Sequence, residues 1–392
     1  MTNATRDRAT QPATLDRASL SPDVEMRLCT AEFPLHQYRE RNLWSSLAGF
    51  TLVEFMVTIA LGMIVVATLV DVFIKSSLSR HETERSGRQI ENGHYAMQVL
   101  TDDLRHAGYF AEFKPDVLAT PAIKPDPCAT DIASLKQALP LHIQGYDIPS
   151  GAAIPSCLSD VRSGTDIVVV RRTSTCVRGS ADCDGAVPGT PYFQASLCGG
   201  ATELSSANTA DWYALDTAGG SLTKTQRNCA TGADIRRYLT RIYFVANNDL
   251  AGDGIPTLKR AELGDNGPGG TAFKIVPLVE GVENLQVEYG IDTDNDGGPD
   301  VFTADPDNYA CVGTACVTNW RNVMAVRVNL LVRNTEATPD YVDSKVYRLG
   351  HKADGSDNVI PAAGTGYGDA FKRHVYQGEV RINNAALRRL VR

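Results

Sequence analysis

The sequence predicts an α+β fold, in which one long N-terminal helix is followed by an antiparallel, β-rich head. The first observation is a run from Phe50 to Val70 that is apolar apart from one carboxylate, Glu54. A helix of about 20 residues, at about 1.5 Å rise per residue, crosses the roughly 30 Å hydrocarbon layer of a membrane. The second is a set of later segments rich in β-branched and aromatic residues. With 392 residues, the chain has room for a large head after the helix.

The helix is expected to continue beyond the membrane. Four apolar residues recur at helical spacing and define one face: Ile90, Met97, Leu100 and Leu104. Gly108 is expected to cap the C-terminal end, and the interior Gly87 and Gly93 to make the helix locally soft. We therefore predict a transmembrane helix over 50–75 and an amphipathic helix over 76–110.

The remaining residues, 111–392, are predicted to form the β-rich head. Five segments have strand composition: 166–172, 238–245, 283–291, 323–333 and 372–382. In 323–333, apolar residues at even positions alternate with a partly polar set that begins at Arg327, which indicates a half-buried strand. The expected layer arrangement is an antiparallel sheet packed on a helix.

Composition argues against two functional classes. The net charge of -8 and the lack of a Lys/Arg-rich stripe disfavour a nucleic-acid partner. The sequence has no G-x-S-x-G or H-E-x-x-H motif, and the glycine-rich 264–270 is not followed by Lys-Ser/Thr. We therefore predict a non-enzymatic protein that requires no cofactor. A membrane-anchored exported hydrolase is the alternative from another class, and it would need a nucleophile and base that no motif indicates.

Cysteine usage predicts disulfides in an exported head. Of the nine cysteines, Cys29 precedes the apolar run and eight follow it. An even number of cysteines in an exported domain is typical of disulfides, and no C-x-x-C pair supports a zinc site. The short spacings Cys176 to Cys183 and Cys311 to Cys316 favour local loops, although the full connectivity stays open. The other four candidates are Cys128, Cys157, Cys198 and Cys229.

Glu54 is the one carboxylate in the first turns of the apolar run. A charge inside a membrane helix is unfavourable, so such a residue usually has a partner or a role. Between Met26 and Gly49, the basic residues Arg27, Arg39 and Arg41 slightly outnumber the acidic residues Glu32 and Glu40, which favours a cytoplasmic N-terminus and an exported head.

The stretch Gly49-Phe50-Thr51-Leu52-Val53-Glu54, followed by an apolar helix, resembles the class III signal of type IV pilins and type II secretion pseudopilins. The resemblance implies that 1–49 is a leader, with Met26 as an alternative start. Prepilin peptidase would cut after Gly49 and methylate the new N-terminal Phe50. Glu54 would then pair with the N-terminal ammonium of a neighbouring subunit as the helices bundle.

Motifs in the head resemble, more specifically, those of PilW-type minor pilins. Five motifs carry it: LRHAGYF (104–110), IPTLKR (255–260), PLVEGVENLQVEYGID (277–292), VMAVRVNLLVRN (323–334) and FKRHVYQGEVRINNAALRR (371–389). The resemblance implies the type IV pilin-like fold and a subunit that primes pilus assembly in a tip complex, supporting adhesion or twitching. Its partners would be other minor pilins, the major pilin, a tip adhesin and prepilin peptidase. It would reside in the inner membrane with a periplasmic head, and later at the tip of the surface pilus. The alternative is a large minor pseudopilin of a type II secretion system.

The segment DTDNDGGPD (292–300) is a candidate calcium loop. It places Asp292, Asp294, Asp296 and Asp300 at relative positions 1, 3, 5 and 9, with Gly297 at position 6. Such spacing suits oxygen ligands wrapped around Ca²⁺, and four carboxylates repel one another unless a cation neutralises them. The position of the EF-hand glutamate is taken by Thr303, so a solvated Asp/Gly turn is the equally weighted alternative.

Overall fold

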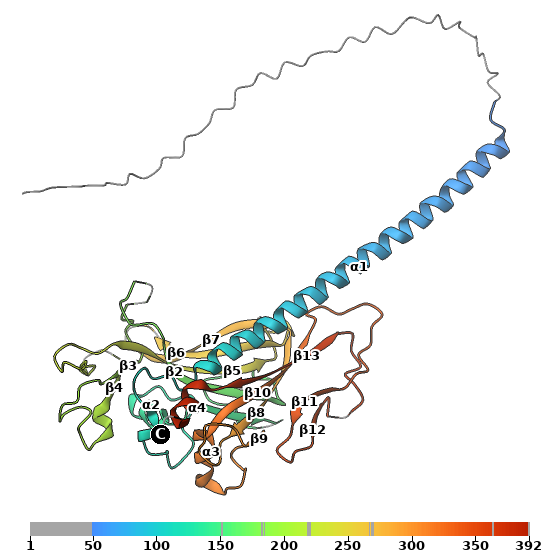
Figure 1. Ribbon diagram of the computed structural model, residues 1–392. Coiled ribbons are helices and arrows are strands. Elements are labelled where there is room, and N and C mark those ends of the chain that lie inside the picture. The colour runs from blue at the N-terminus through green and yellow to red at the C-terminus, as the bar shows by residue number, and fades with distance from the viewer. Residues whose placement is uncertain are drawn as a thin grey trace, which may run out of the picture. The chain divides into compact units, whose positions relative to one another are not determined.

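Figure 1 shows the computed structural model of the chain. It describes residues 49–390 apart from 150–151, 182, 184, 218–220, 266, 268–269 and 363. Most of the predicted leader, including Cys29 and the alternative start Met26, therefore lies outside the described residues.

A single continuous helix, α1, runs from Leu52 to His106. It contains an apolar segment long enough to cross a membrane, and none of that segment is buried within the protein. The chain divides into two compact units, one ending at Ala67 and the other beginning at Thr68. The second unit holds the C-terminal part of α1 together with the head.

All strand pairs of the described head are antiparallel. The strands are β1 Ile143–Ile148, β2 Thr165–Thr173, β3 Tyr192–Ala195, β4 Tyr213–Asp216, β5 Ile235–Ala246, β6 Thr257–Asp265, β7 Thr271–Glu280, β8 Val282–Ile291, β9 Val301–Thr303, β10 Val323–Arg333, β11 Tyr347–His351, β12 Asp357–Ile360 and β13 Arg373–Arg381. The short helices are α2 Ile132–Ala138, α3 Val317–Arg321 and α4 Asn383–Leu390. The five segments predicted from composition correspond to β2, β5, β8, β10 and β13, and the predicted α+β class is confirmed.

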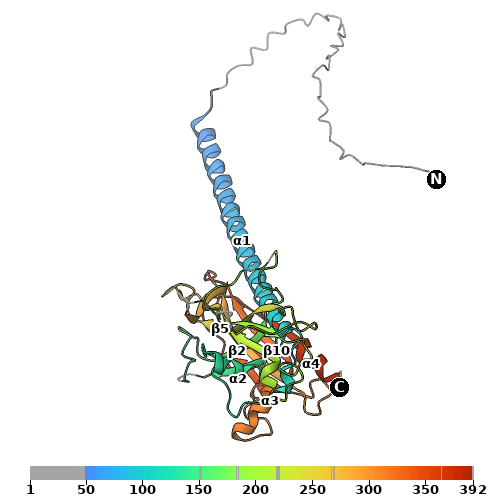
Figure 2. The same ribbon diagram turned by 90° about the vertical axis from the view of Figure 1, so that its left-hand side faces the viewer.

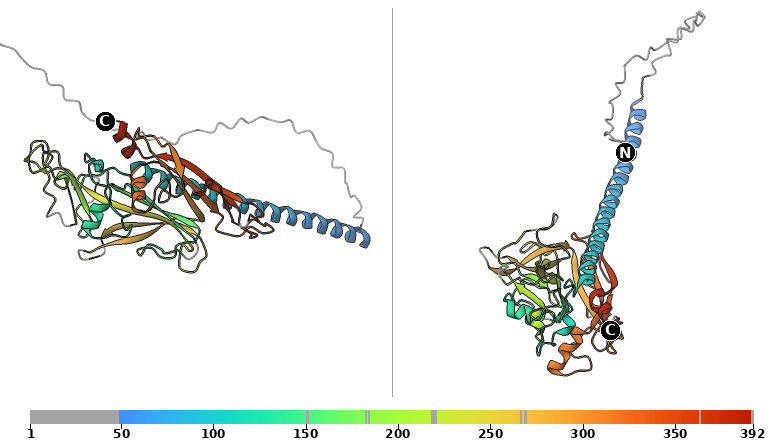
Figure 3. Two further views of the ribbon diagram at one scale, coloured as in Figure 1. Left: turned by 90° about the horizontal axis from the view of Figure 1, so that it is seen from below. Right: turned by 60° about the vertical axis from the view of Figure 1, so that its left-hand side comes forward.

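The strands form two main sheets and one hairpin. The larger sheet has the order β1-β2-β5-β3-β4, with β6 beside β5 and β7 beside β6. The smaller has the order β13-β10-β8-β9, and β11 and β12 form a separate hairpin. Side chains of α1, β2, β5, β8, β10 and β13 share one core, and Figures 1 and 3 show the end of α1 running along these strands. Figures 1 and 2 also show α4 beside the end of α1, where Asn384 donates a hydrogen bond to the carbonyl of Ala107.

The buried face of α1 differs from the predicted one. Leu100 and Leu104 are buried as expected, but Ile90 is 51% exposed. The face turns toward the small residues Gly93 and Ala96 instead, because a side chain at Gly93 would overlap the ring of Tyr376. Gly93 is thus a site of close packing rather than a soft point. The buried residues of the helix are Gln89, Gly93, Ala96, Leu100, Asp103 and Leu104.

Two further features of the helix and β10 can be compared with the prediction. Gly108 lies just beyond α1 with a φ of 73°, which confirms the expected glycine cap. Strand β10 is buried on both faces rather than half-buried. Its Leu331 packs with Tyr347 and Leu349 of β11, since the β11–β12 hairpin covers the face expected to meet solvent.

The eight head cysteines form four disulfides, as predicted. The local pairs Cys176–Cys183 and Cys311–Cys316 have Cα separations of 5.9 and 5.2 Å. The longer loops are closed by Cys128–Cys157 and Cys198–Cys229, with Cα separations of 5.5 and 4.9 Å. Three of the four disulfides lie in the stretch 111–234, where the satellite cores are smaller than the main one.

Candidate functional site

The predicted processing and assembly residues lie at the start of α1. Gly49 and Phe50 precede the helix, and Phe50 is 78% exposed. The hydroxyl of Thr51 accepts a hydrogen bond from the backbone N–H of Glu54 at 3.2 Å. Thr51 is therefore the N-cap and Glu54 the third helical residue, the spacing of a capping box. The sequence analysis overlooked Thr51, although the Thr-x-x-Glu spacing is itself a signal of a helix start.

Glu54 lies at the end of the helix where the peptide dipoles favour a negative charge. In the described chain its carboxylate has no ion-pair partner, whereas Asp71, further along the same helix, pairs with Lys75 at 2.7 Å. Apolar side chains surround Glu54 along the helix, and those of Phe50, Val53 and Phe55 are each more than half exposed. The site is thus an uncompensated carboxylate on an apolar surface.

A buried ion network fastens α1 to the larger sheet. Asp103 is 3% exposed and accepts hydrogen bonds from Arg172 of β2 at 2.6 Å and from Arg241 of β5 at 3.0 Å. The hydroxyl of Tyr243 donates a third bond at 2.8 Å. Burial alone would raise the pKa of Asp103, but the two guanidinium groups outweigh it and hold the pKa below its usual range. Asp103 is therefore ionised and joins three elements. The sequence analysis missed it, although an aspartate within the apolar helix face was a visible signal.

The structure brings together three of the four predicted calcium ligands. Oxygens of Asp292, Asp294 and Asp300 lie within 4.8 Å of one another, and the turn glycine Gly297 has a φ of 84°. The fourth residue, Asp296, is absent from this group. Its carboxylate accepts a hydrogen bond from the backbone N–H of Gly298 at 2.7 Å.

Asp292 already has a counter-charge. It is fully buried, accepts a bond from the N–H of Gly297 at 3.0 Å and pairs with Arg389 of α4 at 2.8 Å. The backbone N–H and the hydroxyl of Thr293 both donate to Asp300 at 2.7 Å and hold the pKa of that carboxyl below its usual range. Part of the repulsion that favoured a cation in the sequence is therefore relieved within the chain, and calcium binding stays a prediction.

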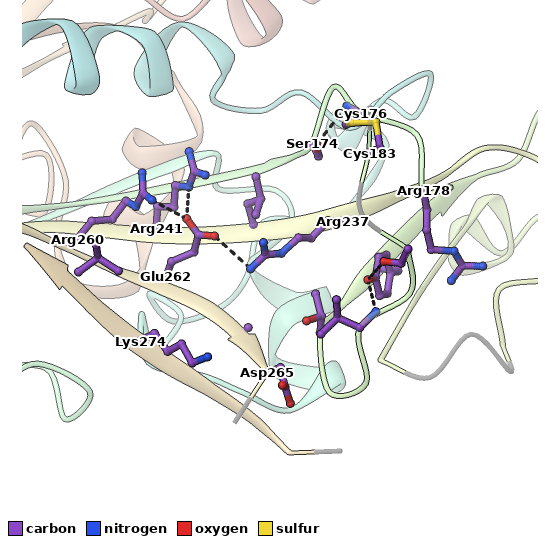
Figure 4. Close-up of a pocket in the computed structure, with 17 residues that line it drawn as sticks. Ser174, Cys176, Arg178, Cys183, Arg237, Arg241, Arg260, Glu262, Asp265 and Lys274 are labelled. Atoms are coloured by element: carbon purple, nitrogen blue, oxygen red, sulfur yellow. Dashed lines mark hydrogen bonds and ion pairs between the residues drawn. A yellow bond between two sulfur atoms is a disulfide. The ribbon is translucent and has the colours of Figure 1, made fainter. Parts of the chain in front are cut away.

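A basic groove with a volume of about 490 Å³ lies over β5, β6 and β7 (Figure 4). At its centre, the carboxylate of Glu262 forms ion pairs with Arg237 at 3.1 Å, Arg241 at 2.7 Å and Arg260 at 3.2 Å. Arg178 and Lys274 add positive charge at the walls. The described lining contains no histidine, and its two cysteines are joined in a disulfide. The groove therefore attracts anions, and these residues do not form a pair of nucleophile and base.

Comparison with known proteins gives one match. The family model of Type IV Pilus-assembly protein W matches residues 242–384, which include β8, β10 and β13. No curated protein and no solved structure matches the chain. The matched strands β8, β10 and β13 contribute to the core that holds α1, together with β2 and β5. Residues 242–384 are therefore similar to the PilW family, which supports involvement of the protein in type IV pilus assembly.

Proposed function

We propose that the protein is a minor pilin, a structural subunit that enters the filament through α1 and presents its head as part of the pilus tip complex. The observation that carries this proposal is the combination of an exposed apolar helix, bearing one uncompensated carboxylate in its first turn, with the family match in the head. The match to a pilus-assembly family favours this role over the pseudopilin alternative.

The proposed maturation begins at the boundary of α1. Prepilin peptidase would cleave after Gly49 and methylate Phe50, which lie in extended, exposed chain before the helix. Cleavage leaves a new ammonium group four residues before Glu54. In the membrane the head would be periplasmic, and the assembled subunit would contact other minor pilins, the major pilin and a tip adhesin.

The proposed role of Glu54 is to pair with the N-terminal ammonium of the adjacent subunit. A carboxylate in an apolar environment is strongly disfavoured unless an opposite charge meets it. An unpaired Glu54 would therefore penalise a wrong register between helices, and a paired one would stabilise the correct register. The capping bond between Thr51 and the backbone of Glu54 leaves the carboxylate free for this contact.

The test replaces Glu54 with valine and, as a matched control, Asp71 with asparagine. Membrane insertion of Glu54→Val should equal or exceed that of the wild type, because a charge is removed. Recovery of the variant in sheared pili, measured by immunoblot against the membrane pool, should fall strongly. Asp71→Asn should assemble normally, since Asp71 has its partner Lys75 on the same helix. If Glu54→Val is recovered in sheared pili at the wild-type level, the proposed pairing role of Glu54 is wrong.

Processing has a separate test. Mass spectrometry of the protein from peptidase-positive cells should give a mature chain that begins with methylated Phe50. An intact leader in such cells would contradict the proposal.

We further propose that the loop 292–300 binds Ca²⁺ at millimolar concentrations, with Asp294 and Asp300 as the more accessible ligands. The supporting observation is the convergence of three carboxylates around the turn. Because Arg389 already neutralises Asp292, the ion would have to displace or share this contact.

A further inference from the structure

A second and larger cavity, of about 700 Å³, lies where the two sheets of the head meet. Residues of β1 and β2 line one side, and residues of β8, the β11–β12 hairpin and the segment 304–308 line the other. We refer to this cavity as the intersheet cleft. Pockets between packed elements, lined by a few convergent polar groups, are common ligand sites.

The hydroxyl of Tyr289 is the first unusual feature of the cleft. Tyr289 is only 2% exposed, yet it lines the cleft, and its hydroxyl has no hydrogen-bond partner within the described chain. A buried tyrosine usually finds a partner for this group. Trp320 fixes the ring by edge-to-face packing with centroids 4.7 Å apart. Gly145 of β1 makes room for the hydroxyl, since a side chain there would overlap it.

Two carboxyl groups also line the cleft. Asp147 of β1 and Asp166 of β2 are directly opposite in the antiparallel register, so their side chains share one face of the sheet. Asp166 is 7% exposed, and one of its oxygens accepts a hydrogen bond from the N–H of Val287 at 2.7 Å. The other oxygen has no partner in the part of the chain that the structure describes.

The surroundings of Asp166 disfavour its ionised form. Burial raises its pKa well above the usual range, and the nearby charge of Asp147 adds to this shift. Burial and Asp305 likewise raise the pKa of Asp147. The cleft therefore presents the phenol of Tyr289 and the carboxyl group of Asp166, whose second oxygen is available for a hydrogen bond with a ligand.

The charged residues that line the cleft indicate which ligand charge it can accept. The described lining contains the carboxyl groups of Asp147, Asp166, Asp305, Asp307 and Asp354, against the ammonium groups of Lys124 and Lys352 and the imidazole of His351. Lys124 lies 4.2 Å from the ring centre of Tyr146 and is bonded to Asp307. An anion would meet this acidic lining, and a cation would meet the ammonium groups of Lys124 and Lys352 in the same lining. Neutral hydroxyl groups fit both Tyr289 and Asp166.

We propose that the intersheet cleft binds a neutral carbohydrate, whose ring hydroxyls exchange hydrogen bonds with Tyr289 and Asp166. This inference goes beyond pilus assembly and does not depend on the proposed roles of Gly49, Phe50 and Glu54. It assigns a recognition site to the head. Tyr289 lies within the family match, whereas Gly145 and Asp166 lie outside it.

The test uses the full-length protein in a zwitterionic detergent, because maltoside and glucoside detergents would compete for the site. Maltotetraose, cellotetraose and chitotetraose are titrated separately to 10 mM, with binding followed by saturation-transfer NMR and calorimetry. Tetragalacturonate and hexalysine serve as acidic and cationic probes. At least one neutral tetrasaccharide should bind, and more tightly than either charged probe.

The diagnostic variant is Tyr289→Phe, which keeps the ring and removes only the unpartnered hydroxyl. Its affinity for the tetrasaccharide should fall roughly 3- to 10-fold, the loss expected for one neutral hydrogen bond, while its melting temperature stays the same or rises. Tyr238→Phe is the matched control, since Tyr238 is fully buried outside the cleft, and it should bind like the wild type. Three results would each overturn the proposal: no binding of any neutral tetrasaccharide at 10 mM, tighter binding of a charged probe, or unchanged binding by Tyr289→Phe.

Discussion

Replacing Asp103 with asparagine tests how α1 is held to the head. Asp103 is 3% exposed and is bonded to Arg172, Arg241 and Tyr243 from two strands of the larger sheet. Removing one partner of a buried ion pair costs about 3–5 kcal/mol, because the opposite charge stays buried without compensation. Here Arg241 keeps a second partner in Glu262 at 2.7 Å, so the lower half of this range is expected.

At about 2–4 °C per kcal/mol for a large domain, a loss of about 3–4 kcal/mol lowers the melting temperature by roughly 6–16 °C. The assay is near-ultraviolet circular dichroism of the full-length protein in detergent during heating. Asp102→Asn is the matched control: its side chain is 58% exposed and its contact with Arg105 is 4.0 Å long. Exposed pairs of this kind contribute about 0–1 kcal/mol, so the control should melt nearly like the wild type.

The stabilising effect of Asp103 should also depend on pH, and the direction follows from its lowered pKa. The folded-state pKa of Asp103 lies below the ordinary value of 3.8. Its contribution to the free energy of unfolding is therefore fully present above about pH 4 and is lost as the pH falls through the lower, folded-state pKa. The difference in melting temperature between wild type and Asp103→Asn should be constant at neutral pH and shrink below pH 3.8. Equal melting of Asp103→Asn and Asp102→Asn at pH 7 would refute the reasoning.

Three further perturbations test separate features. Gly93→Ala should destabilise the protein by about 1–3 kcal/mol, because the new side chain overlaps Tyr376. Gly87→Ala, whose side chain meets nothing within 4 Å, should stabilise it by up to about 1 kcal/mol. Equal effects of the two substitutions in thermal melts would contradict the packing role of Gly93. Removing the disulfide Cys128–Cys157, which spans 29 residues, should cost about 3.6 kcal/mol against about 2 kcal/mol for Cys311–Cys316, which spans 5. Denaturant unfolding of the two double-serine variants measures the difference, and the reverse order would argue against the chain-entropy account. Ca²⁺ at 5 mM should stabilise the wild type by about 1–2 kcal/mol but not the double variant Asp294→Ala, Asp296→Ala, and identical melts with Ca²⁺ and with chelator would remove the calcium loop.

Local composition was enough to predict α1 and five of the thirteen described strands. β-Branched and aromatic runs identified β2, β5, β8, β10 and β13, because side chains that suit a pleated, buried surface are concentrated there. The apolar run identified α1, and cysteine spacing identified the two local disulfides. These signals lie within single segments, where propensity and periodicity act.

Contacts between distant segments were not predictable in this way. The buried face of α1 was predicted wrongly at Ile90, which is exposed. The prediction used the spacing of apolar residues and therefore ignored Gly93, although the lack of a side chain at Gly93 is what lets the ring of Tyr376 pack against the helix. Asp103 likewise has partners far along the chain, on β2 and β5. The intersheet cleft needs both sheets to be placed before its groups can be recognised.

The family match covers only part of the intersheet cleft. The match at 242–384 includes β8, which lines the cleft, together with β10 and β13, which pack on α1. The stretch 111–241 lies outside it and supplies the cleft residues of β1 and β2. Ile143 of β1 and Val168 and Val170 of β2 also belong to the core under α1, so both sets of lining residues rest on strands that hold the helix. If the cleft binds a carbohydrate as proposed, its specificity is expected to depend on individual polar side chains such as Asp166, because a larger change in any of these strands would also disturb the packing of α1.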